Sequence, residues 1–385
     1  MSAEHRSLVE PIRTDLQKKF VFLSGPRQVG KTTLAQHLMR SLRGQYLSYD
    51  DDDDRQVILQ KKYVAKSVVC LDEFHKFPRW KSHLKGVYDK HHATLHLLLT
   101  GSARLDVYQK SGDSLSGRYY LHHLHPLTAG ELHTAKIPPL PTDWSAPAPA
   151  VSALPDLMRF GGFPEPFYAQ SEAEHRRWSN TRRQLLVREE LRDLTQIELL
   201  GLVEQLMLLL PQRIGSLFSQ RSLAEDIRVS APTIQNWMQV FERLFVLFKI
   251  APYTKRIARS LQKQPKYYFT DWSQIPDEGS RFENCVASHL WKAVQTWTNL
   301  GLANLDLHFL RDRDQREVDF LITREQRPWF IVECKLAETQ FSESLRYFSR
   351  QLVVPGIQLL LKKGVHRTEG ELTVISANHW LGHLP

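Results

Sequence analysis

The segment G-P-R-Q-V-G-K-T-T, residues 25–33, constrains the fold of this chain more than any other feature. It follows a short apolar run, residues 20–23, which has the length and composition of a buried parallel strand. The two glycines allow the backbone to wrap around an anion with its N–H groups pointing inward. A helix that begins at Lys31 would direct its positive end to the same place. We therefore predict a phosphate-binding loop between a strand and a helix.

This loop has the spacing required to bind a nucleoside triphosphate. Lys31 would reach the β- and γ-phosphates, and the hydroxyl group of Thr32 would bind Mg²⁺. ATP and Mg²⁺ are therefore the expected cofactors. The predicted nucleotide-binding residues are Gly25, Pro26, Arg27, Gln28, Val29, Gly30, Lys31, Thr32 and Thr33.

A second apolar run, residues 68–71, ends in two adjacent acids, Asp72 and Glu73. In P-loop enzymes an aspartate in this position holds Mg²⁺, and a neighbouring residue positions the attacking water. Asp72 is thus the predicted metal ligand, and Glu73 is the predicted catalytic base. Two acids after a strand also occur in solvated turns, but the phosphate loop upstream favours the catalytic interpretation.

A third apolar run, residues 95–99, ends at Thr100, which we expect to sense the γ-phosphate. Arg104 and Arg118 are candidates for a cation that stabilises transferred phosphoryl charge. Arg118 is favoured because it follows a glycine and precedes a strand-like segment, residues 119–124. The sequence leaves open whether this arginine acts within one copy or across an interface in a homo-oligomer.

Five consecutive aspartates, residues 50–54, follow a further expected strand, residues 46–50. Adjacent like charges repel each other and are typical of solvated surface. We predict a solvated loop here.

Several strings make the chain resemble a prokaryotic family of AAA-type ATPases whose C-terminal region has no assigned function. They are the phosphate loop, L-D-E-F-H-K-F-P-R-W, L-T-G-S-A, S-G-R followed by H-P-L-T-A-G-E-L, and G-G-F-P-E, in this order along nearly the whole chain. The resemblance implies an α/β fold with a parallel sheet in the order 5-1-4-3-2. It also implies a winged helix and a position near the nucleotide for Gly161, Gly162 and Pro164.

The expected organisation has five parts. Residues 1–135 form the ATPase domain, and residues 136–153, which are rich in proline, form an extended linker. Helical apolar spacing over residues 154–210 predicts a lid. Residues 211–270 correspond to the winged helix, and residues 271–385 to a nuclease-like α/β domain.

The winged-helix prediction depends on a helix-turn-helix pattern around residues 222–244. Ser230 is a suitable N-cap for the second helix, and Gln235 and Asn236 would lie nearest a DNA groove. A basic stretch, residues 253–268, would be the wing and contact phosphates through Lys255, Arg256, Arg259, Lys263 and Lys266. A winged helix that is purely structural or binds protein is the alternative.

The last segment carries Glu283, Asp319, Glu333 and Lys335, and we expect all four to be catalytic. Glu333 and Lys335 are two residues apart, so a strand would direct both side chains to one face. Asp319 and Glu333 could hold Mg²⁺ while Lys335 activates a water. The pattern resembles the PD-(D/E)XK nucleases, although Val318 stands where their name has proline. A relic fold that only binds DNA or a partner is the alternative.

Composition excludes some classes of protein. Three widely spaced cysteines argue against a disulfide framework or a structural zinc site, so a reducing cytoplasm is expected. No apolar run is long enough to span a bilayer. A net charge of +9 favours a polyanionic partner such as DNA. We therefore predict an ATP-hydrolysing, DNA-binding protein that couples ATP turnover to a nuclease-like domain. The alternative is an ATP-dependent switch or remodeller with a non-catalytic docking module.

Overall fold

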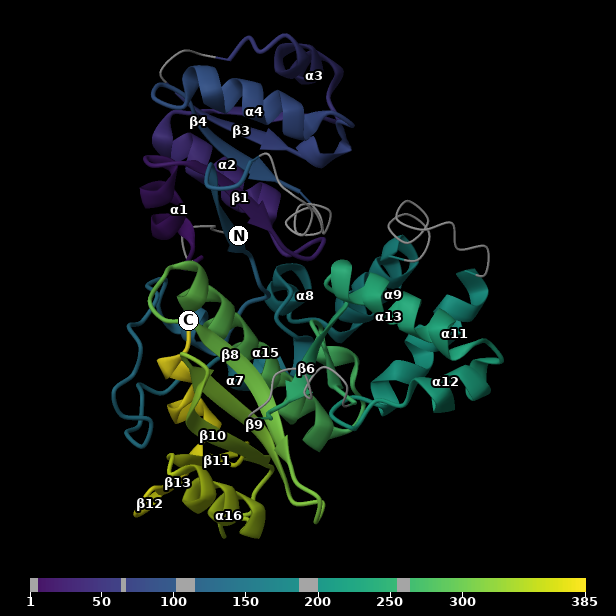
Figure 1. Ribbon diagram of the computed structural model, residues 1–385, viewed down its shortest axis with the longest axis vertical. Helices are drawn as coiled ribbons and strands as arrows, with labels where there is room; N and C mark the ends of the chain where they lie inside the picture. Colours follow the sequence, from purple (N-terminus) through teal and green to yellow (C-terminus); the bar gives the residue numbers. More distant parts are fainter. Residues whose placement is uncertain (1–5, 64–66, 102–114, 187–199, 255–263) are drawn as a thin grey trace. The chain divides into compact units, whose positions relative to one another are not determined.

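The computed structural model describes residues 6–63, 67–101, 115–186, 200–254 and 264–385. The chain forms two compact units (Figure 1). Unit 1 comprises Met1–Pro126, Thr134–Ile137 and Arg243–Phe245, and unit 2 comprises Leu127–His133, Pro138–Glu242 and Val246–Pro385.

Unit 1 is built on a parallel sheet of five strands within the described residues. The order is β2-β3-β4-β1-β5, which confirms the expected order 5-1-4-3-2. Central strand β1 pairs in parallel with both β4 and β5. The strands are β1 (Phe20–Ser24), β2 (Gln45–Ser48), β3 (Val68–Asp72), β4 (His96–Thr100) and β5 (Tyr119–His123).

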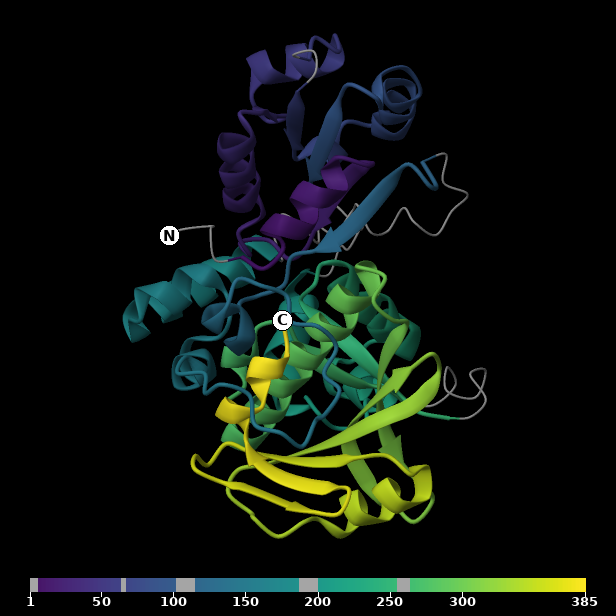
Figure 2. The ribbon, with the colours of Figure 1, turned by 90° about the vertical axis from the view of Figure 1, so that its left-hand side faces the viewer.

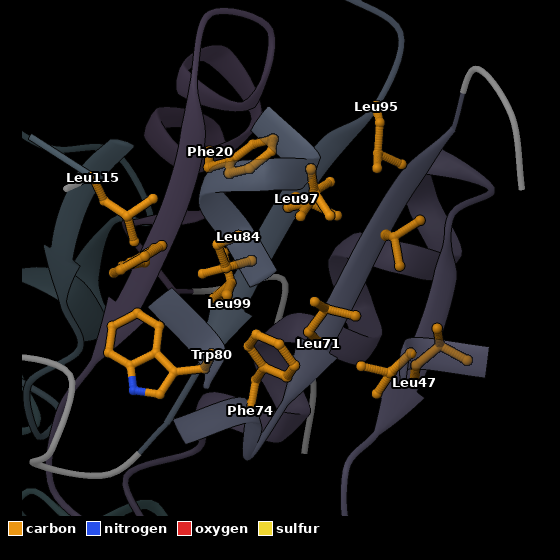
Figure 3. Close-up of a cluster of buried hydrophobic side chains, with 14 residues drawn as sticks. Phe20, Leu47, Leu71, Phe74, Trp80, Leu84, Leu95, Leu97, Leu99 and Leu115 are labelled. Atoms are coloured by element: carbon orange, nitrogen blue, oxygen red, sulfur yellow. The ribbon is translucent and has the colours of Figure 1, made fainter. Parts of the chain in front are cut away.

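Helices cover this sheet because its central strands are apolar on both faces. They are α1 (Val9–Leu16), α2 (Lys31–Leu42), α3 (Asp52–Leu59) and α4 (Trp80–His91), with a short 3₁₀ turn at Phe74–Lys76. Figure 3 shows side chains from neighbouring strands, such as Leu71, Leu97 and Leu99, meeting Trp80 and Leu84 of α4. All of these side chains are at most 4% exposed, and the cluster is the core of unit 1.

The aspartate run does not form the solvated loop that its charge predicts. Asp51 is the N-cap of α3, and its carboxylate accepts hydrogen bonds from the backbone N–H groups of Asp53 and Asp54. The Asp54 carboxylate accepts a further bond, 2.8 Å long, from the N–H of Ser48. Acids at a helix N-terminus are stabilised by the helix dipole and by unsatisfied N–H groups. These interactions outweigh the mutual repulsion on which the loop prediction was based.

Unit 2 contains a mixed sheet with the order β12-β13-β11-β10-β9-β8-β6-β7 across the part that the structure describes. The long strands β8 and β9 pair antiparallel and run side by side in both views (Figures 1 and 2). Its strands are β6 (Leu247–Pro252), β7 (Lys266–Phe269), β8 (Leu305–Arg311), β9 (Glu317–Arg324), β10 (Arg327–Lys335), β11 (Gly356–Leu360), β12 (His366–Glu369) and β13 (Leu372–Ser376).

The helices of unit 2 fall into two groups. Helices α15 (Glu278–Asn299) and α16 (Glu343–Leu352) pack against the sheet. The remaining helices precede the sheet in the chain, and those of the expected lid have the helical structure that their spacing predicts. They are α6 (Ala129–His133), α7 (Leu154–Phe160), α8 (Pro164–Ala169), α9 (Glu172–Leu185), α11 (Leu200–Leu209), α12 (Gln220–Ile227) and α13 (Ala231–Arg243).

The proline-rich segment after residue 137 has no regular structure, but it is packed along unit 2. Trp144 is 3% exposed, and its ring lies 4.0 Å from that of Phe330 and 5.3 Å from that of Trp380, measured between centroids. The indole N–H of Trp297 donates to the carbonyl of Pro138. Aromatic contacts thus hold this segment in place.

Helix α6 is anchored in unit 2 by buried polar groups on α15. The N–H of Ala129 donates to Nε2 of His289, whose Nδ1 therefore carries the proton and donates to the carbonyl of Cys285. Burial lowers the pKa of His289 to about 4, which keeps this ring neutral. Lys292 forms a buried ion pair with Glu131, 2.8 Å long. These bonds fix α6 within unit 2.

Replacing Gly130 with alanine should destabilise unit 2, because a Cβ there would overlap the carbonyl oxygen of Leu384. Overpacking of this kind costs about 1–3 kcal/mol. Gly201→Ala is the matched control: this exposed glycine lies in α11 with open space around its Cβ position. The control should stabilise the helix by up to about 1 kcal/mol. Thermal unfolding of both variants tests the prediction, and a Gly130→Ala variant as stable as wild type would contradict it.

Candidate functional site

The predicted phosphate loop lies between β1 and α2, as the sequence indicates. Gly25 and Gly30 have φ angles of 151° and 98°, which side chains disfavour. A Cβ on Gly25 would also overlap the carbonyl oxygen of Leu124, so close packing requires glycine there. Lys31 is buried, and its ammonium group donates to the carbonyls of Gly25 and Pro26 at 2.9 and 2.8 Å. The lysine is thereby held at the mouth of the loop.

The start of α2 is open to an anion. Gly30 is its N-cap and provides no side-chain hydrogen bond, so the first backbone N–H groups are not capped by a side chain. A phosphate group is a suitable acceptor for such groups. The loop and the helix start therefore place backbone N–H groups where a phosphate could accept their hydrogen bonds.

Arg6 supports this loop from the N-terminal side, a role that the sequence analysis missed. It is 7% exposed, and its guanidinium donates to the carbonyls of Val29 and His125. A lone arginine 23 residues from its partner leaves no local pattern, so no motif could have indicated it.

Asp72 is the centre of the predicted nucleotide site. It ends β3, is 5% exposed, and its Oδ2 accepts a 3.0 Å hydrogen bond from the hydroxyl of Thr32. The hydroxyls of Tyr46 and Thr100 also donate to this carboxylate. The predicted metal ligands Thr32 and Asp72 are therefore adjacent, and their oxygen atoms are the kind of ligand that Mg²⁺ prefers. The predicted γ-phosphate sensor, Thr100, is brought to the same carboxylate.

Tyr46 was not among the predicted site residues. Its strand β2 pairs with β3, which places Tyr46 opposite Cys70 and within reach of Asp72. Burial, reinforced by the Asp72 carboxylate, raises the pKa of Tyr46, so the phenol stays protonated and donates. A lone tyrosine in an expected strand gives no sequence signal for this contact.

Glu73 follows Asp72 with a left-handed backbone, φ 53°. Its carboxylate lies 3.7 Å from the ammonium of Lys76 and 3.7 Å from the ring of His75. Burial raises the pKa of Glu73, although the nearby charge of Lys76 counteracts the rise. A raised pKa makes a carboxylate a better proton acceptor, as a general base requires.

Arg118 is not brought to the phosphate loop of its own unit. It precedes β5, whose first residue, Tyr119, pairs with Phe20 at the start of β1, whereas the loop follows the other end of β1. Its guanidinium forms a 3.1 Å ion pair with Asp89. Arg104 lies outside the described residues.

In unit 2 the structure brings together the four predicted residues of the C-terminal domain. Strand β9 pairs antiparallel with β10 and places Asp319 beside Glu333, and the Asp319 carboxylate accepts the N–H of Cys334 at 2.8 Å. Lys335 lies 2.9 Å from Glu333, which confirms that both point to one face. Glu283 extends from α15 into electrostatic contact with Asp319. We call Glu283, Glu317, Asp319 and Glu333 the acidic cluster.

Lys266 belongs to this cluster and not to a solvent-facing wing. It is 2% exposed, and its ammonium lies 2.6 Å from Glu317 and 3.7 Å from Glu283. The prediction that Lys266 contacts DNA phosphates is therefore wrong, because the side chain is buried against acids. The other predicted wing residues, Lys255, Arg256, Arg259 and Lys263, lie outside the described residues.

Burial is the main influence on the pKa values of the carboxyl groups in this cluster. It raises the pKa of Glu283, Asp319 and Glu333, and mutual repulsion with Asp319 adds to the rise for the two glutamates. For Lys266 burial alone would lower the pKa, but the surrounding acids outweigh it and raise the pKa. The lysine therefore stays charged.

The donor set for a metal ion here is incomplete within the described part of the chain. Oε2 of Glu333 is buried without a hydrogen-bond partner, so one oxygen is available to a cation. No group of three or more histidine, cysteine, aspartate or glutamate residues among those described is arranged to hold a metal. Asp319 and Glu333 could therefore bind Mg²⁺ only with water completing its shell.

The helix-turn-helix pattern corresponds to α12 and α13. Oγ of Ser230 accepts the N–H of Thr233 at 3.2 Å, as expected of the N-cap. Gln235 and Asn236 are exposed on α13, while Trp237 and Met238 are buried. The antiparallel pair of β6 and β7 follows.

Gly161, whose φ is 73°, lies in unit 2 against Asp271. A Cβ at this position would come within 2.8 Å of the Asp271 carboxylate, which explains the need for glycine. Its expected position near the nucleotide stays a prediction.

Comparison with known families agrees with the geometry of unit 1. Residues 17–133 match a family described as an AAA domain. Residues 151–274 and 278–380 match two domains of unknown function, DUF8612 and DUF4143. Uncharacterized proteins of Mycobacterium bovis and Mycobacterium tuberculosis are each 22% identical over 357 residues, which is 90% of this chain and 77% of theirs.

Three solved structures are similar at low identity. The Aeropyrum pernix ORC1 protein in complex with DNA is 15% identical with a TM-score of 0.32, covering 74% of this chain and 91% of that one. The Thermotoga maritima RuvB Holliday junction branch migration motor is 16% identical with a TM-score of 0.31, covering 66% and 95%. A Walker-type ATPase of Pyrococcus abyssi is 13% identical with a TM-score of 0.38, covering 70% and 92%.

No helix within the described ranges combines the length and apolar character that crossing a bilayer requires. With its loop, its adjacent acids and its match over residues 17–133, unit 1 is similar to AAA domains.

Lys31→Ala should abolish measurable ATP binding, because the phosphates lose the ammonium group held at the loop. Lys85→Ala is a suitable control, since Lys85 is exposed on α4 of the same unit. Titration of a fluorescent ATP analogue would measure both affinities. Equal affinity of the Lys31 variant and wild type would contradict this assignment.

Proposed function

We propose that this protein is a Mg²⁺-dependent ATPase that binds DNA and couples ATP turnover to its nuclease-like C-terminal domain. The ATPase part of this proposal rests on one observation. The hydroxyl groups of Thr32, Tyr46 and Thr100 all donate hydrogen bonds to the Asp72 carboxylate beside the phosphate loop. This arrangement joins the helix after the loop to three neighbouring strands at the edge where a triphosphate would lie.

In this mechanism the loop N–H groups and Lys31 bind the phosphates, and Thr32 and Asp72 would hold Mg²⁺. When bound there, Mg²⁺ would supply positive charge that stabilises the charge developing on the phosphates. Glu73 accepts the proton of the attacking water, and its raised pKa suits this task. Thr100 reports the γ-phosphate to Asp72. Because Arg118 lies at the other end of β5, a charge-stabilising role for it requires a second copy of the chain.

Glu73→Gln should slow ATP hydrolysis by about 100-fold or more, because the amide cannot accept the proton. ATP affinity should stay near that of wild type, because the loop N–H groups and Lys31, and not Glu73, would bind the phosphates. Glu10→Gln, at an exposed acid of α1, serves as control. Release of inorganic phosphate at saturating ATP measures the rate, and a variant that hydrolyses at the wild-type rate would remove Glu73 from this role.

DNA binding is supported by the exposed Gln235 and Asn236 on α13 and by the net charge of +9. Polar side chains at the start of a second helix are suited to base edges in a groove. Glu283, Asp319, Glu333 and Lys335 then provide the acids and the lysine that metal-assisted phosphodiester hydrolysis requires.

The competing proposal is an ATP-dependent switch or remodeller whose C-terminal domain only docks DNA or protein. The incomplete donor set of the acidic cluster within the described residues favours it.

Glu333→Gln and Lys335→Ala distinguish the two proposals. If the domain cuts DNA, both variants should lose Mg²⁺-dependent cleavage of single-stranded, duplex or branched DNA while ATPase rates with and without DNA stay unchanged. Lys363→Ala, an exposed lysine after β11, is the control. Absence of cleavage by wild type on every substrate would leave only the switch.

A further inference from the structure

The acidic cluster already contains a cation that belongs to the protein. Lys266 is the first residue of β7, and its ammonium is enclosed by acids, 2.6 Å from Glu317 and 3.7 Å from Glu283. The charge of Asp319 also acts on it. A lysine that is 2% exposed is rare unless acids pair with it. Here it contacts acids from both α15 and β9.

The surrounding structure leaves Glu283 little freedom to leave this lysine. The hydroxyl of Tyr268, on the same strand, donates to Glu283 at 2.8 Å. On another side, Gly215 has a φ of 72°, and a Cβ there would lie 3.0 Å from the same carboxylate. Glu283 is therefore held between β7 and the turn at Gly215, with Lys266 at its oxygen atoms.

The charges of the cluster are largely compensated without a metal ion. Lys335 pairs with Glu333 at 2.9 Å, and Arg311 pairs with Glu317 at 2.6 Å. Lys266 supplies the remaining positive charge among Glu283, Glu317 and Asp319. A divalent cation brought among these carboxylates would meet a buried ammonium group, and the low dielectric of the protein interior would screen their repulsion only weakly.

We propose that the Lys266 ammonium occupies the cation position of the acidic cluster and excludes divalent metal ions from it. The cluster takes up Mg²⁺ or Mn²⁺ only when the β6–β7 hairpin withdraws this lysine. This inference rests on the nuclease-like half of the proposed function, because it concerns when that site can be loaded.

Strands β6 and β7 are connected through the chain to α13, the helix proposed to bind DNA. Helix α13 is followed three residues later by β6, and β6 pairs with β7 through Ile250 and Lys266. A displacement of α13 on DNA would therefore be passed to Lys266 through the sheet. Loading of the metal site would thus depend on engagement of the helix-turn-helix.

Calorimetric titration of the full chain with Mn²⁺, in the absence of nucleotide and DNA, tests this proposal. Wild type and Glu333→Gln should give the same titration, because the cluster takes no metal in either. Lys266→Met should gain a Mn²⁺ site at least 10-fold tighter than any that wild type has in this cluster. The double variant Lys266→Met/Glu333→Gln should lose that site. Mn²⁺ bound near the phosphate loop contributes equally to the titrations of wild type and the three variants, so it does not affect their comparison.

Lys249→Met is the matched control. This lysine lies on β6 of the same hairpin with its side chain 52% exposed, and it pairs with Glu242 outside the cluster. It should bind Mn²⁺ as wild type does. In thermal unfolding, Lys266→Met should melt below wild type in EDTA and recover with Mn²⁺, because the metal replaces the lost positive charge.

Two results would overturn the proposal. One is a Mn²⁺ site in wild type that Glu333→Gln removes, since Lys266 would then not exclude the metal; this comparison needs no Lys266 variant to fold. The other is a folded Lys266→Met that gains no site. Neither the titration nor the unfolding experiment depends on DNA cleavage. A gain of Mn²⁺ binding without cleavage by any variant would therefore support this inference while the nuclease function fails.

Discussion

The hydrogen bonds to the Asp72 carboxylate are the interactions on which the candidate nucleotide site depends. This carboxylate accepts hydrogen bonds from Thr32 on α2, Tyr46 on β2 and Thr100 on β4. A buried carboxylate surrounded by hydroxyl donors stays where those donors hold it, and each donor in turn has its position fixed. The parallel order of the sheet makes this possible, because adjacent strands end at one edge.

In unit 2 the carboxylates are held by ion pairs with lysines, as the Asp72 carboxylate is held by hydroxyl donors. The acids of α15, β9 and β10 approach one another only because Lys266 and Lys335 lie among them. Removing one partner of a buried ion pair is costly, since the charge left behind has neither water nor counter-ion. The acidic cluster therefore fixes the position of β7 relative to α15 and β9.

Local patterns predicted the parts of the fold that depend on local physics. The loop at residues 25–33, the strands around it, the order 5-1-4-3-2 and the shared face of Glu333 and Lys335 followed from spacing or resemblance. Most of what the sequence did not indicate depends on long-range partners. Arg6, Tyr46 and Lys266 act through residues far away in the chain, and a basic residue in a basic stretch gives no sign that it is buried. The aspartates at α3 failed because capping outweighed repulsion.

The packing of Trp144 determines how this protein can be divided into fragments. Its ring packs against those of Phe330 and Trp380, and the carbonyl of Pro138 accepts the indole N–H of Trp297. A C-terminal fragment that begins after residue 153 would lack this cover and expose several large aromatic surfaces to water. Such a fragment would tend to self-associate.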